Sequence, residues 1–572
     1  MTTRIAIIGS GPTGIYTLSG LVSGEQSLSI TIFEIEADPG KGTPYHPDIN
    51  DNAMLANIAS IELPEICETL VEWLRRQSDA ELQRLNVVRA NIREREFYPR
   101  VVLGEYLQSQ FRQVIAKGIA NGHTIEIRPR HRVVDIRLLA DDIQLTVKMP
   151  DGERKDYAFD HVVMATGHNW PDTTEIKPGY FVSPWPARSL KQIKPSTVGV
   201  LGTSLSAIDA LITVSTAHGA FYLDAAGQLQ YQGSPGSDDF HCTMMSRKGL
   251  LPEADFYCEY PYAPLQYCTE KAVDALIERG SANLLDDVFE LFKLEIAARD
   301  PDYAARIGLA LLNVETIAPA YFAAREAADP FVWAASNLAE AKQNKSNRHT
   351  VGWRYAILCM HEVIARAIPH LDEGDLSRFH KKFKTVFVDD YATVPHQSIE
   401  RLLALRRAGK LDILRLGTDY EISTEGIQRG AVVRYGGNEA TFDAFIDATG
   451  QASMSARDMP FPSLIEQGVI KPAATPEGTP IIIRETEEAF TRTGGVDLDA
   501  AFRLKFEDNL SNRLYCAAIS FLLHKLPFVQ GITSSHQIGG IVSRAILEDI
   551  EAGHGEATFR LADASRDVAN LQ

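Results

Sequence analysis

The chain has 572 residues, of which 45% are hydrophobic and 23% are charged. That much apolar material can form several cores, so the length predicts two to four domains, or two nested ones. The 57 basic and 75 acidic residues give a net charge of -18, and such an acidic chain repels nucleic-acid phosphates and anionic lipids. Nucleic acids and membrane surfaces are therefore excluded as expected partners.

The six cysteines are scattered, without a CxxC pair or another metal-ligand spacing. This pattern predicts free thiols in a reducing cytoplasm and no metal site. The first residues lead directly into a short apolar run and a glycine turn. Because this run is too short for a secretory signal and no run of about 18 apolar residues follows, we expect a soluble, cytoplasmic protein.

The first 34 residues have the pattern of a complete dinucleotide-binding unit, with strands at 5–8 and 30–33 and a helix at 15–21. The loop before the helix consists of Gly9, Ser10, Gly11, Pro12, Thr13 and Gly14. Its three glycines permit a tight turn, close approach of a pyrophosphate, and packing of the helix on the strand. Glu34 lies 20 residues after Gly14, where a carboxylate binds ribose hydroxyls but repels a 2'-phosphate. The unit predicts a site for FAD or NAD; a common glycine-rich turn is the alternative.

A second unit of this kind begins with an apolar strand at 197–201 and continues with a helix to about 214. The loop between them consists of Gly202, Thr203, Ser204, Leu205, Ser206 and Ala207. Ser204 and Ala207 replace the second and third glycines, and both are small enough for backbone approach and close packing. An ordinary structural turn between strand and helix is the alternative.

The next apolar strand, 240–245, ends in Ser246, Arg247 and Lys248, where the first unit has Glu34. Cations at this position hold a 2'-phosphate, which selects NADPH. A solvated strand end is the alternative, because the intervening segment 219–239 is longer than usual.

A ten-residue similarity links the two halves of the chain: FDHVVMATGH at 159–168 and FDAFIDATGQ at 442–451. Each follows alternating strands with a glycine turn, so each predicts a β-meander that leads into a strand ending in Ala-Thr-Gly beside a nucleotide. The expected nucleotide contacts are Thr166, Gly167, Thr449 and Gly450. Two merely similar strand ends are the alternative.

Between 253 and 385 helical periodicity replaces the β-type alternation. We expect this insert to carry substrate specificity and the contact surface of a homodimer. It contains AKQNKSNRHTVGWR at 341–354, a basic run in a very acidic chain. Arginine forks there could pair with the carboxylates of a small acidic substrate; a solvated charged face is the alternative.

Taken together, these features resemble the two-dinucleotide-binding flavoproteins, including the flavin N-hydroxylating monooxygenases, in which an NADPH domain interrupts an FAD domain. Five segments are more closely similar to the FAD/NAD(P)-binding group that contains nitrosuccinate synthase, an aspartate N-monooxygenase. These segments are 40–60, 97–107, 199–210, 246–252 and 531–540.

The resemblance implies that Asn57 and the segment 98–100, which includes Arg100, lie near the flavin, and that the last helix starts under its pyrimidine edge. Thr533 or Ser534 can cap a helix at 541–547, and its N-terminus would stabilise negative charge on the flavin. The resemblance also favours two catalytic-site residues in the insert, to which the loop before the last helix adds a third polar candidate. These three residues are Asn347, Arg348 and His536.

The predicted fold class is α/β, with two Rossmann-like dinucleotide-binding domains, for FAD and NADPH, and a mainly helical insert. The predicted segments are 1–190 and 386–572 for the two parts of the FAD domain, 191–252 for the NADPH domain and 253–385 for the insert.

The predicted function is that of a monooxygenase: NADPH reduces FAD, molecular oxygen adds to the reduced flavin at C4a, and the peroxide hydroxylates an amine nitrogen. The expected substrate is an amino acid or small amine, with L-aspartate as the leading candidate. Alternatives are a reductase without oxygen insertion and a non-enzymatic nucleotide-binding protein. A disulfide reductase is disfavoured because Cys258 and Cys268 are ten residues apart in the insert.

Overall fold

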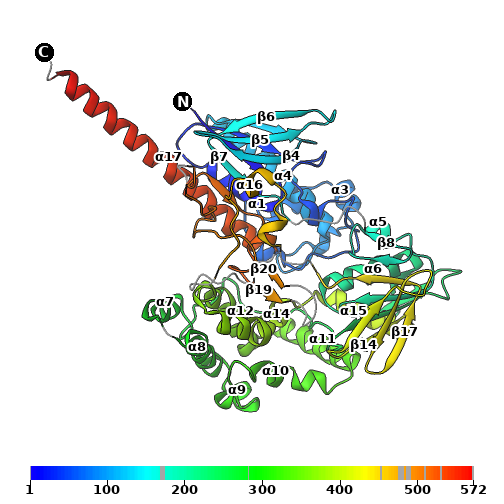
Figure 1. Ribbon diagram of the computed structural model, residues 1–572. Coiled ribbons are helices and arrows are strands. Elements are labelled where there is room, and N and C mark those ends of the chain that lie inside the picture. The colour runs from blue at the N-terminus through cyan, green and yellow to red at the C-terminus, as the bar shows by residue number, and fades with distance from the viewer. Residues whose placement is uncertain are drawn as a thin grey trace.

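The computed structural model describes residues 2–167, 174–280, 282–450, 454–474, 482–484, 491–507, 510–528 and 531–569. Figure 1 shows two α/β domains and a region of helices beside them, and each of the three has its own buried apolar core. The predicted fold class is therefore confirmed. The last residues of the two repeats, His168 and Gln451, lie outside the described residues.

The first domain is built on a parallel sheet of five strands in the order β21-β7-β1-β2-β3. These strands are β1 (Thr3–Ile8), β2 (Leu28–Phe33), β3 (Thr124–Arg128), β7 (His161–Met164) and β21 (Leu514–Cys516). Except for the edge strand β3, these strands are near-continuous apolar runs, and they are buried because helices pack against the sheet. The helices of this domain include α1 (Pro12–Leu21), α4 (Arg100–Ala120) and α17 (Gly531–Ala569). A meander precedes β7 and consists of β4 (Arg132–Leu138), β5 (Ile143–Lys148) and β6 (Arg154–Phe159).

The second domain has a six-stranded sheet in the order β14-β13-β10-β18-β9-β8. Its strands are β8 (Glu175–Lys177), β9 (Tyr180–Phe181), β10 (Thr197–Leu201), β13 (His241–Ser246), β14 (Leu411–Arg415) and β18 (Ala444–Asp447). All neighbours are parallel except β8 and β9. The second domain also contains the helices α6 (Leu205–His218) and α15 (His396–Arg407) and a hairpin of β11 (Gly219–Leu223) and β12 (Leu229–Gly233). A meander precedes β18 and consists of β15 (Tyr420–Ser423), β16 (Ala431–Tyr435) and β17 (Asn438–Phe442).

The repeated segments occupy equivalent places in the two domains. In the first domain, β7 pairs in parallel with β1, and Met164 lies opposite Ile8. In the second domain, β18 pairs in parallel with β10, and Asp447 lies opposite Leu201. Each strand follows a three-stranded meander, so the similarity between the two segments is structural.

The pairing of β18 corrects the predicted domain boundaries. The prediction assigned the whole of 386–572 to the first domain, but β14 and β18 are strands of the second sheet. The prediction also assigned residues 175–181 to the first domain, but they form the other edge of the second sheet. The physical reason is that β18, which leads into the second Ala-Thr-Gly, pairs with β10, which leads into the second glycine loop.

The helical insert separates β13 from β14, and no strand occurs in the described residues between them. Its helices are α7 (Glu270–Arg279), α8 (Leu284–Arg299), α9 (Pro301–Arg306), α10 (Ile317–Glu326), α11 (Pro330–Asn347), α12 (Gly352–Ala365), α13 (Glu373–Arg378) and α14 (Lys384–Tyr391). The remaining helices and strands are α2 (Leu70–Arg76), α3 (Asp79–Arg84), α5 (Ala187–Leu190), α16 (Pro462–Glu466), β19 (Ile482–Arg484) and β20 (Thr491–Thr493).

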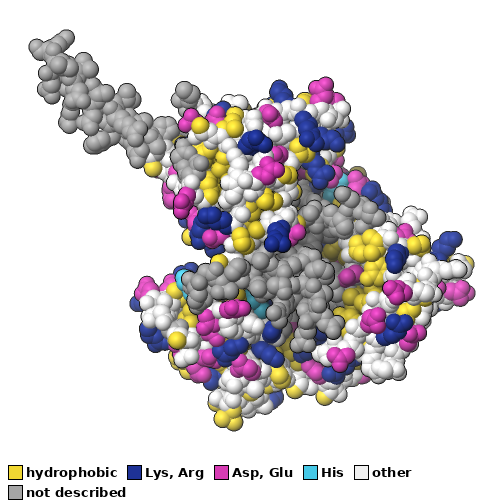
Figure 2. Space-filling view, viewed as in Figure 1, with side chains coloured by type: hydrophobic (Ala, Val, Ile, Leu, Met, Phe, Trp, Pro, Cys, Tyr) yellow, Lys and Arg dark blue, Asp and Glu magenta, His cyan; other side chains and the backbone are white. Residues whose placement is uncertain are grey.

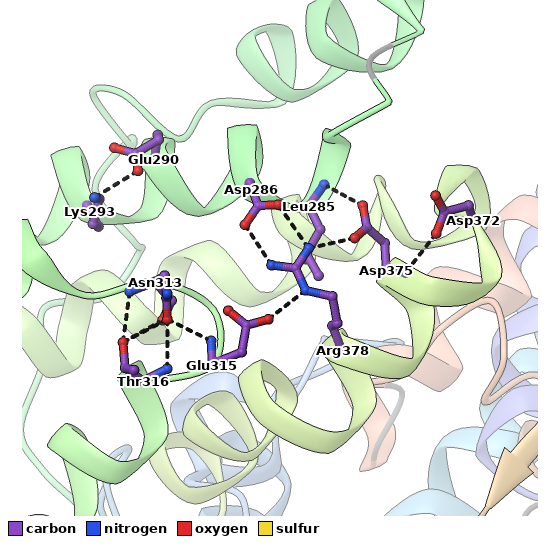
Figure 3. A network of polar contacts seen from close by, with 10 residues as sticks. All are labelled: Leu285, Asp286, Glu290, Lys293, Asn313, Glu315, Thr316, Asp372, Asp375 and Arg378. Atoms are coloured by element: carbon purple, nitrogen blue, oxygen red, sulfur yellow. Dashed lines mark hydrogen bonds and ion pairs between the residues drawn. The ribbon is translucent and has the colours of Figure 1, made fainter.

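Arg378 joins three parts of the insert (Figure 3). Its guanidinium donates to Glu315 at 2.6 Å, to Asp375 at 2.7 Å and to Asp286 at 2.8 and 2.9 Å. These hydrogen bonds lower the pKa of the Asp286 and Glu315 carboxyl groups. The insert is thus held by a polar network as well as by its apolar core.

Candidate functional site

The first glycine loop lies between β1 and α1, against the end of β7. Gly9 has a φ of +103°, and a Cβ atom there would lie 2.3 Å from the carbonyl oxygen of Ala165. A Cβ at Gly14 would lie 2.2 Å from the carbonyl oxygen of Gly9. A Cβ at Gly11 would meet only the Cα of Gly42, at 3.4 Å. Packing therefore requires Gly9 and Gly14, whereas Gly11 leaves space at the N-terminus of α1, where a pyrophosphate binds in such loops.

Pro12 is the first residue of α1, a position at which its missing N–H costs no helical hydrogen bond. Glu34 follows β2 and is 9% exposed. Its Oε2 atom accepts hydrogen bonds from the Ser10 backbone N–H at 3.0 Å and from the Ser10 hydroxyl at 2.6 Å, and its Oε1 atom accepts from the Glu36 N–H. A carboxylate offers about four acceptor positions, so one remains for a ribose hydroxyl. Glu34 thus fixes the glycine loop and still fits an adenine dinucleotide.

The segment 54–57 lies against 98–100, as the family resemblance implied for residues near a flavin. The Ala56 N–H donates to the Tyr98 carbonyl and the Arg100 N–H donates to the Met54 carbonyl, both at 2.9 Å. The Oδ1 atom of Asn57 is buried and accepts no hydrogen bond from the described residues. A ligand with N–H or O–H donors would satisfy this atom, so these residues fit a bound flavin.

The last helix begins ten residues earlier than predicted. Helix α17 begins at Gly531, so Thr533 and Ser534 lie in its first turn and His536 lies in the helix, not in a loop before it. The expected start at 541 is wrong because the pair Gly539 and Gly540, which looks like a break in the sequence, lies inside the helix.

Gly539 marks the contact between α17 and α1. A Cβ atom at Gly539 would lie 2.8 Å from the Thr17 backbone nitrogen, so the two helices approach closely there. Near the start of α17, the Thr13 hydroxyl donates to the Ser535 hydroxyl at 3.1 Å, and His536 packs edge-on against Tyr16 at 4.9 Å between ring centroids. The start of α17 therefore lies beside the glycine-loop helix.

The second glycine loop repeats the geometry of the first. Gly202 has a φ of +121°, and a Cβ there would lie 2.8 Å from the carbonyl oxygen of Ala448, the counterpart of Ala165. The Thr203 hydroxyl donates to the Ser246 hydroxyl at 3.1 Å. Ser204 is the N-cap residue of α6, and Ser206 lies in its first turn.

The threonine and glycine of each Ala-Thr-Gly segment, at the ends of β7 and β18, are solvent-exposed, whereas the alanines are buried. The exposed residues are Thr166, Gly167, Thr449 and Gly450. The N–H and hydroxyl of Thr449 both donate to Asp447, at 3.0 and 2.7 Å. The positions predicted for nucleotide contacts are thus accessible in both domains.

The end of β13 carries two cations that differ in their surroundings. Lys248 forms an ion pair with Glu326 at 2.8 Å, and its ammonium lies 3.6 Å from the ring centroid of Phe322. Arg415, at the end of the neighbouring strand β14, pairs with the same Glu326 at 3.3 Å. Arg247 is exposed, and its side chain has no hydrogen bond or ion pair with the described residues. Arg247 is therefore the cation that is available to a 2'-phosphate.

Asn347 and Arg348 lie at the C-terminal end of α11, and both are exposed. Arg348 is the C-cap residue, with a φ of 51°. Lys345 of the same run donates to the Arg95 carbonyl of the first domain at 3.3 Å. Among the described residues no hydrogen bond or ion pair joins Asn347 or Arg348 to His536. The surface position of Asn347 and Arg348 corresponds to the solvated face that was the alternative for this run, whereas Arg354 at its end is buried.

A narrow crevice between the first and second domains contains two charged residues that the sequence did not indicate, Asp209 and Arg401. It is lined by Asn57 and Arg100 from the first domain and by Asp209 and Arg401 from α6 and α15. Asp209 is 6% exposed and pairs with Arg100 at 2.7 Å. Burial raises the pKa of Asp209 to about 6, although Arg100 and Arg401 lower it. The sequence did carry a signal for Asp209, because it is a single acid in the otherwise uncharged helix α6 that follows the second glycine loop.

The six cysteines are free thiols. No group of three or more His, Cys, Asp or Glu side chains in the described part of the chain is arranged to hold a metal ion. No helix in that described part combines the length and apolar content that crossing a bilayer requires.

Two protein families match parts of the chain. Residues 6–169 match a family described as FAD-NAD(P)-binding, and residues 269–391 match the YdhS-like middle domain. The first match covers the glycine loop, Glu34 and β7, and the second coincides with the helices of the insert. The first domain is thus an FAD/NAD(P)-binding domain.

A curated relative and two solved structures are similar over nearly the whole chain. The Escherichia coli (strain K12) protein YdhS is 39% identical over 556 residues, which cover 97% of this chain and 99% of that protein. The ornithine N-hydroxylase of Kutzneria sp. 744 is 13% identical with a TM-score of 0.48, covering 96% of this chain and 100% of that one. The L-lysine 6-monooxygenase of Pseudomonas syringae is 13% identical with a TM-score of 0.42, covering 96% and 99%.

Proposed function

The chain belongs to the family of YdhS, and we propose that it is an FAD-dependent monooxygenase that consumes NADPH and molecular oxygen. The proposed reaction hydroxylates the amine nitrogen of a small polar substrate, and L-aspartate is the first candidate. The observation that carries the proposal is the presence of two glycine loops of the same construction, one followed by an acid and the other by a free cation.

The two loops suit different nucleotides. Glu34 keeps an acceptor position for the ribose of FAD and would repel a 2'-phosphate. Arg247 offers an exposed guanidinium at the corresponding place in the second domain, where it favours NADPH. Bound FAD supplies the electron transfer from NADPH to oxygen, which side chains alone do not provide.

The residues of the chain position these molecules and exclude water. Gly11 and the N-terminus of α1 would hold the pyrophosphate, and the segments around Asn57 and Arg100 would contact the flavin. The start of α17 lies beside α1, and its positive end would stabilise negative charge on the cofactor.

The test begins with the colour and flavin content of the purified protein. We expect yellow protein with one FAD per chain and NADPH oxidation that rises when a substrate is added. Incorporation of labelled oxygen into the product would distinguish the monooxygenase from a reductase. A colourless protein that fails to bind added FAD would contradict both.

A further inference from the structure

The end of helix α10 places a carboxylate against the cations at the ends of β13 and β14. Glu326 is the last residue of α10. Its Oε1 atom lies 2.8 Å from the Nζ atom of Lys248, and its Oε2 atom lies 3.3 Å from an Nη atom of Arg415. One carboxylate thus joins the ends of two neighbouring strands, as the oxygens of a bound phosphate would.

Buried contacts of α10 fix the position of Glu326. The adjacent Arg325 is 5% exposed and donates to the Leu251 carbonyl at 2.7 Å, and the Tyr321 hydroxyl donates to Asp389 of α14 at 2.9 Å. Exposed ion pairs are usually weak, because two long side chains must be ordered. Here the anchored helix orders the acid, so the two cations meet a carboxylate that is already in place.

The same two cations border the position at which Arg247 is expected to bind a nucleotide 2'-phosphate. The N–H of Gly417, two residues after Arg415, donates to the Arg247 carbonyl at 3.0 Å, so the ends of β13 and β14 are held together. A phosphate beside Arg247 would therefore also be attracted by Lys248 and Arg415. The negative charge of Glu326 opposes that attraction.

We propose that Glu326 is a specificity-determining residue for the nucleotide of the second domain. It holds Lys248 and Arg415 in place of a phosphate, so that Arg247 alone is free to distinguish NADPH from NADH. The proposal rests on the proposed function, because it requires NADPH at the second glycine loop. It also gives the insert a part in the choice of cofactor, since the acid comes from α10 whereas the cations come from the strand ends of the second domain.

The experiment measures equilibrium binding of NADP+ and NAD+ to the FAD-loaded protein, so the result does not depend on turnover. Glu326→Gln is compared with the original protein, and the same change is then made in the variant Lys248→Ala/Arg415→Ala. The matched control is Glu340→Gln, since Glu340 is an exposed acid on the following helix, α11. Melting temperatures establish that each variant is folded.

We expect Glu326→Gln to tighten NADP+ binding by roughly threefold to tenfold, because one or two partly screened cations become available to the 2'-phosphate. NAD+ lacks this phosphate, so its dissociation constant should change by less than about twofold. Glu340→Gln should change neither nucleotide. In the variant without Lys248 and Arg415, the change at Glu326 should have little effect on NADP+.

An unchanged or weaker affinity of Glu326→Gln for NADP+ would overturn the proposal. An equal gain for NAD+ would also overturn it, because it would indicate only a general effect of charge. The same holds if the full gain persists without Lys248 and Arg415, or if no variant binds NADP+. Failure of the proposed function alone would appear instead as missing oxygen incorporation in protein that binds both FAD and NADP+.

Discussion

Neighbouring residues at the end of β13 are expected to make unequal contributions to nucleotide binding. Because Arg247 is free and Lys248 is engaged with Glu326 and Phe322, Arg247→Ala should lower kcat/KM for NADPH by roughly 10-fold to 100-fold, the loss of a charge-assisted phosphate contact. The value for NADH should hardly change, since NADH lacks the 2'-phosphate. Lys248→Ala is the matched control and should have the smaller effect. Equal losses for both nucleotides in Arg247→Ala would remove this residue from the phosphate site.

Asp255, in the segment between β13 and α7, should make the stability of the protein depend on pH. Burial raises its pKa to about 8, with a further increase from Glu62 and an opposing effect of Lys345 and Arg95. The folded protein therefore holds a proton on Asp255 that the unfolded chain releases near its ordinary pKa of 3.8. Stability from this group is complete below that value and is lost as the pH rises toward 8.

Asp255→Asn removes this dependence because an amide does not ionise. We expect the melting temperature of the variant to exceed that of the original protein by an amount that is small near pH 5 and grows by about 1 to 3 °C toward pH 8 for a chain of this size. Thermal unfolding between pH 5 and 8 measures the difference. A difference in melting temperature that stays constant between pH 5 and 8 would contradict the raised pKa of Asp255.

At the scale of elements, the adjacent glycines of α17 provide a test of helix packing. A Cβ at Gly539 would collide with the backbone of α1, whereas a Cβ at Gly540 would meet nothing within 4 Å. Gly540→Ala should stabilise the protein by up to about 1 kcal/mol because alanine favours the helix. Gly539→Ala has the same gain in helix propensity but forces the helices apart, so we expect its free energy of unfolding to fall by about 1 to 3 kcal/mol. Urea unfolding measures the free energies of both variants, and similar free energies for the two would refute the close contact.

Elements with strong local patterns were predictable from the sequence, and elements defined by distant partners were not. The β1-α1-β2 unit, β10 and β13 follow from apolar runs and glycine turns, and the structure has them at nearly the expected residues. The start of α17 was missed because a packing contact with α1 explains its internal glycines. The crevice was missed because Asn57 and Asp209 are far apart in sequence and meet only when both domains are folded.

At the scale of the whole molecule, a buried ionic network joins the segment that enters the insert after β13 to the helices α10, α11 and α12 of the insert. Glu253, in the segment after β13, is 3% exposed and pairs with Arg354 of α12, and the Trp333 indole donates to it at 2.8 Å. Burial alone would raise the pKa of Glu253, but Arg354 and Arg325 outweigh it and the pKa is lowered. Figure 2 shows acidic and basic side chains mixed over the visible surface, where such pairs contribute far less.

Arg354→Met should therefore destabilise the protein by about 3 to 5 kcal/mol, the usual effect of leaving a buried partner charge behind. Arg366, at the end of the same helix, is the matched control because its pair with Asp274 is 43% and 40% exposed. Arg366→Met should lower the free energy of unfolding by less than about 1 kcal/mol. Urea midpoints, together with the rate of limited proteolysis within 253–391, measure the contrast. An equally mild effect of both changes would show that the network does not hold the insert.

The order of the chain through its three regions also determines when each can fold during synthesis. The sheet of the first domain takes β1 from the start of the chain and β21 from residues 514–516, while α1 needs α17 as its packing partner. The second sheet waits for β18, whereas the described core of the insert comes almost entirely from the continuous stretch 268–387. On the ribosome the insert is thus complete first and the first domain last, so the nascent first half exposes an unfinished sheet edge until β21 has emerged.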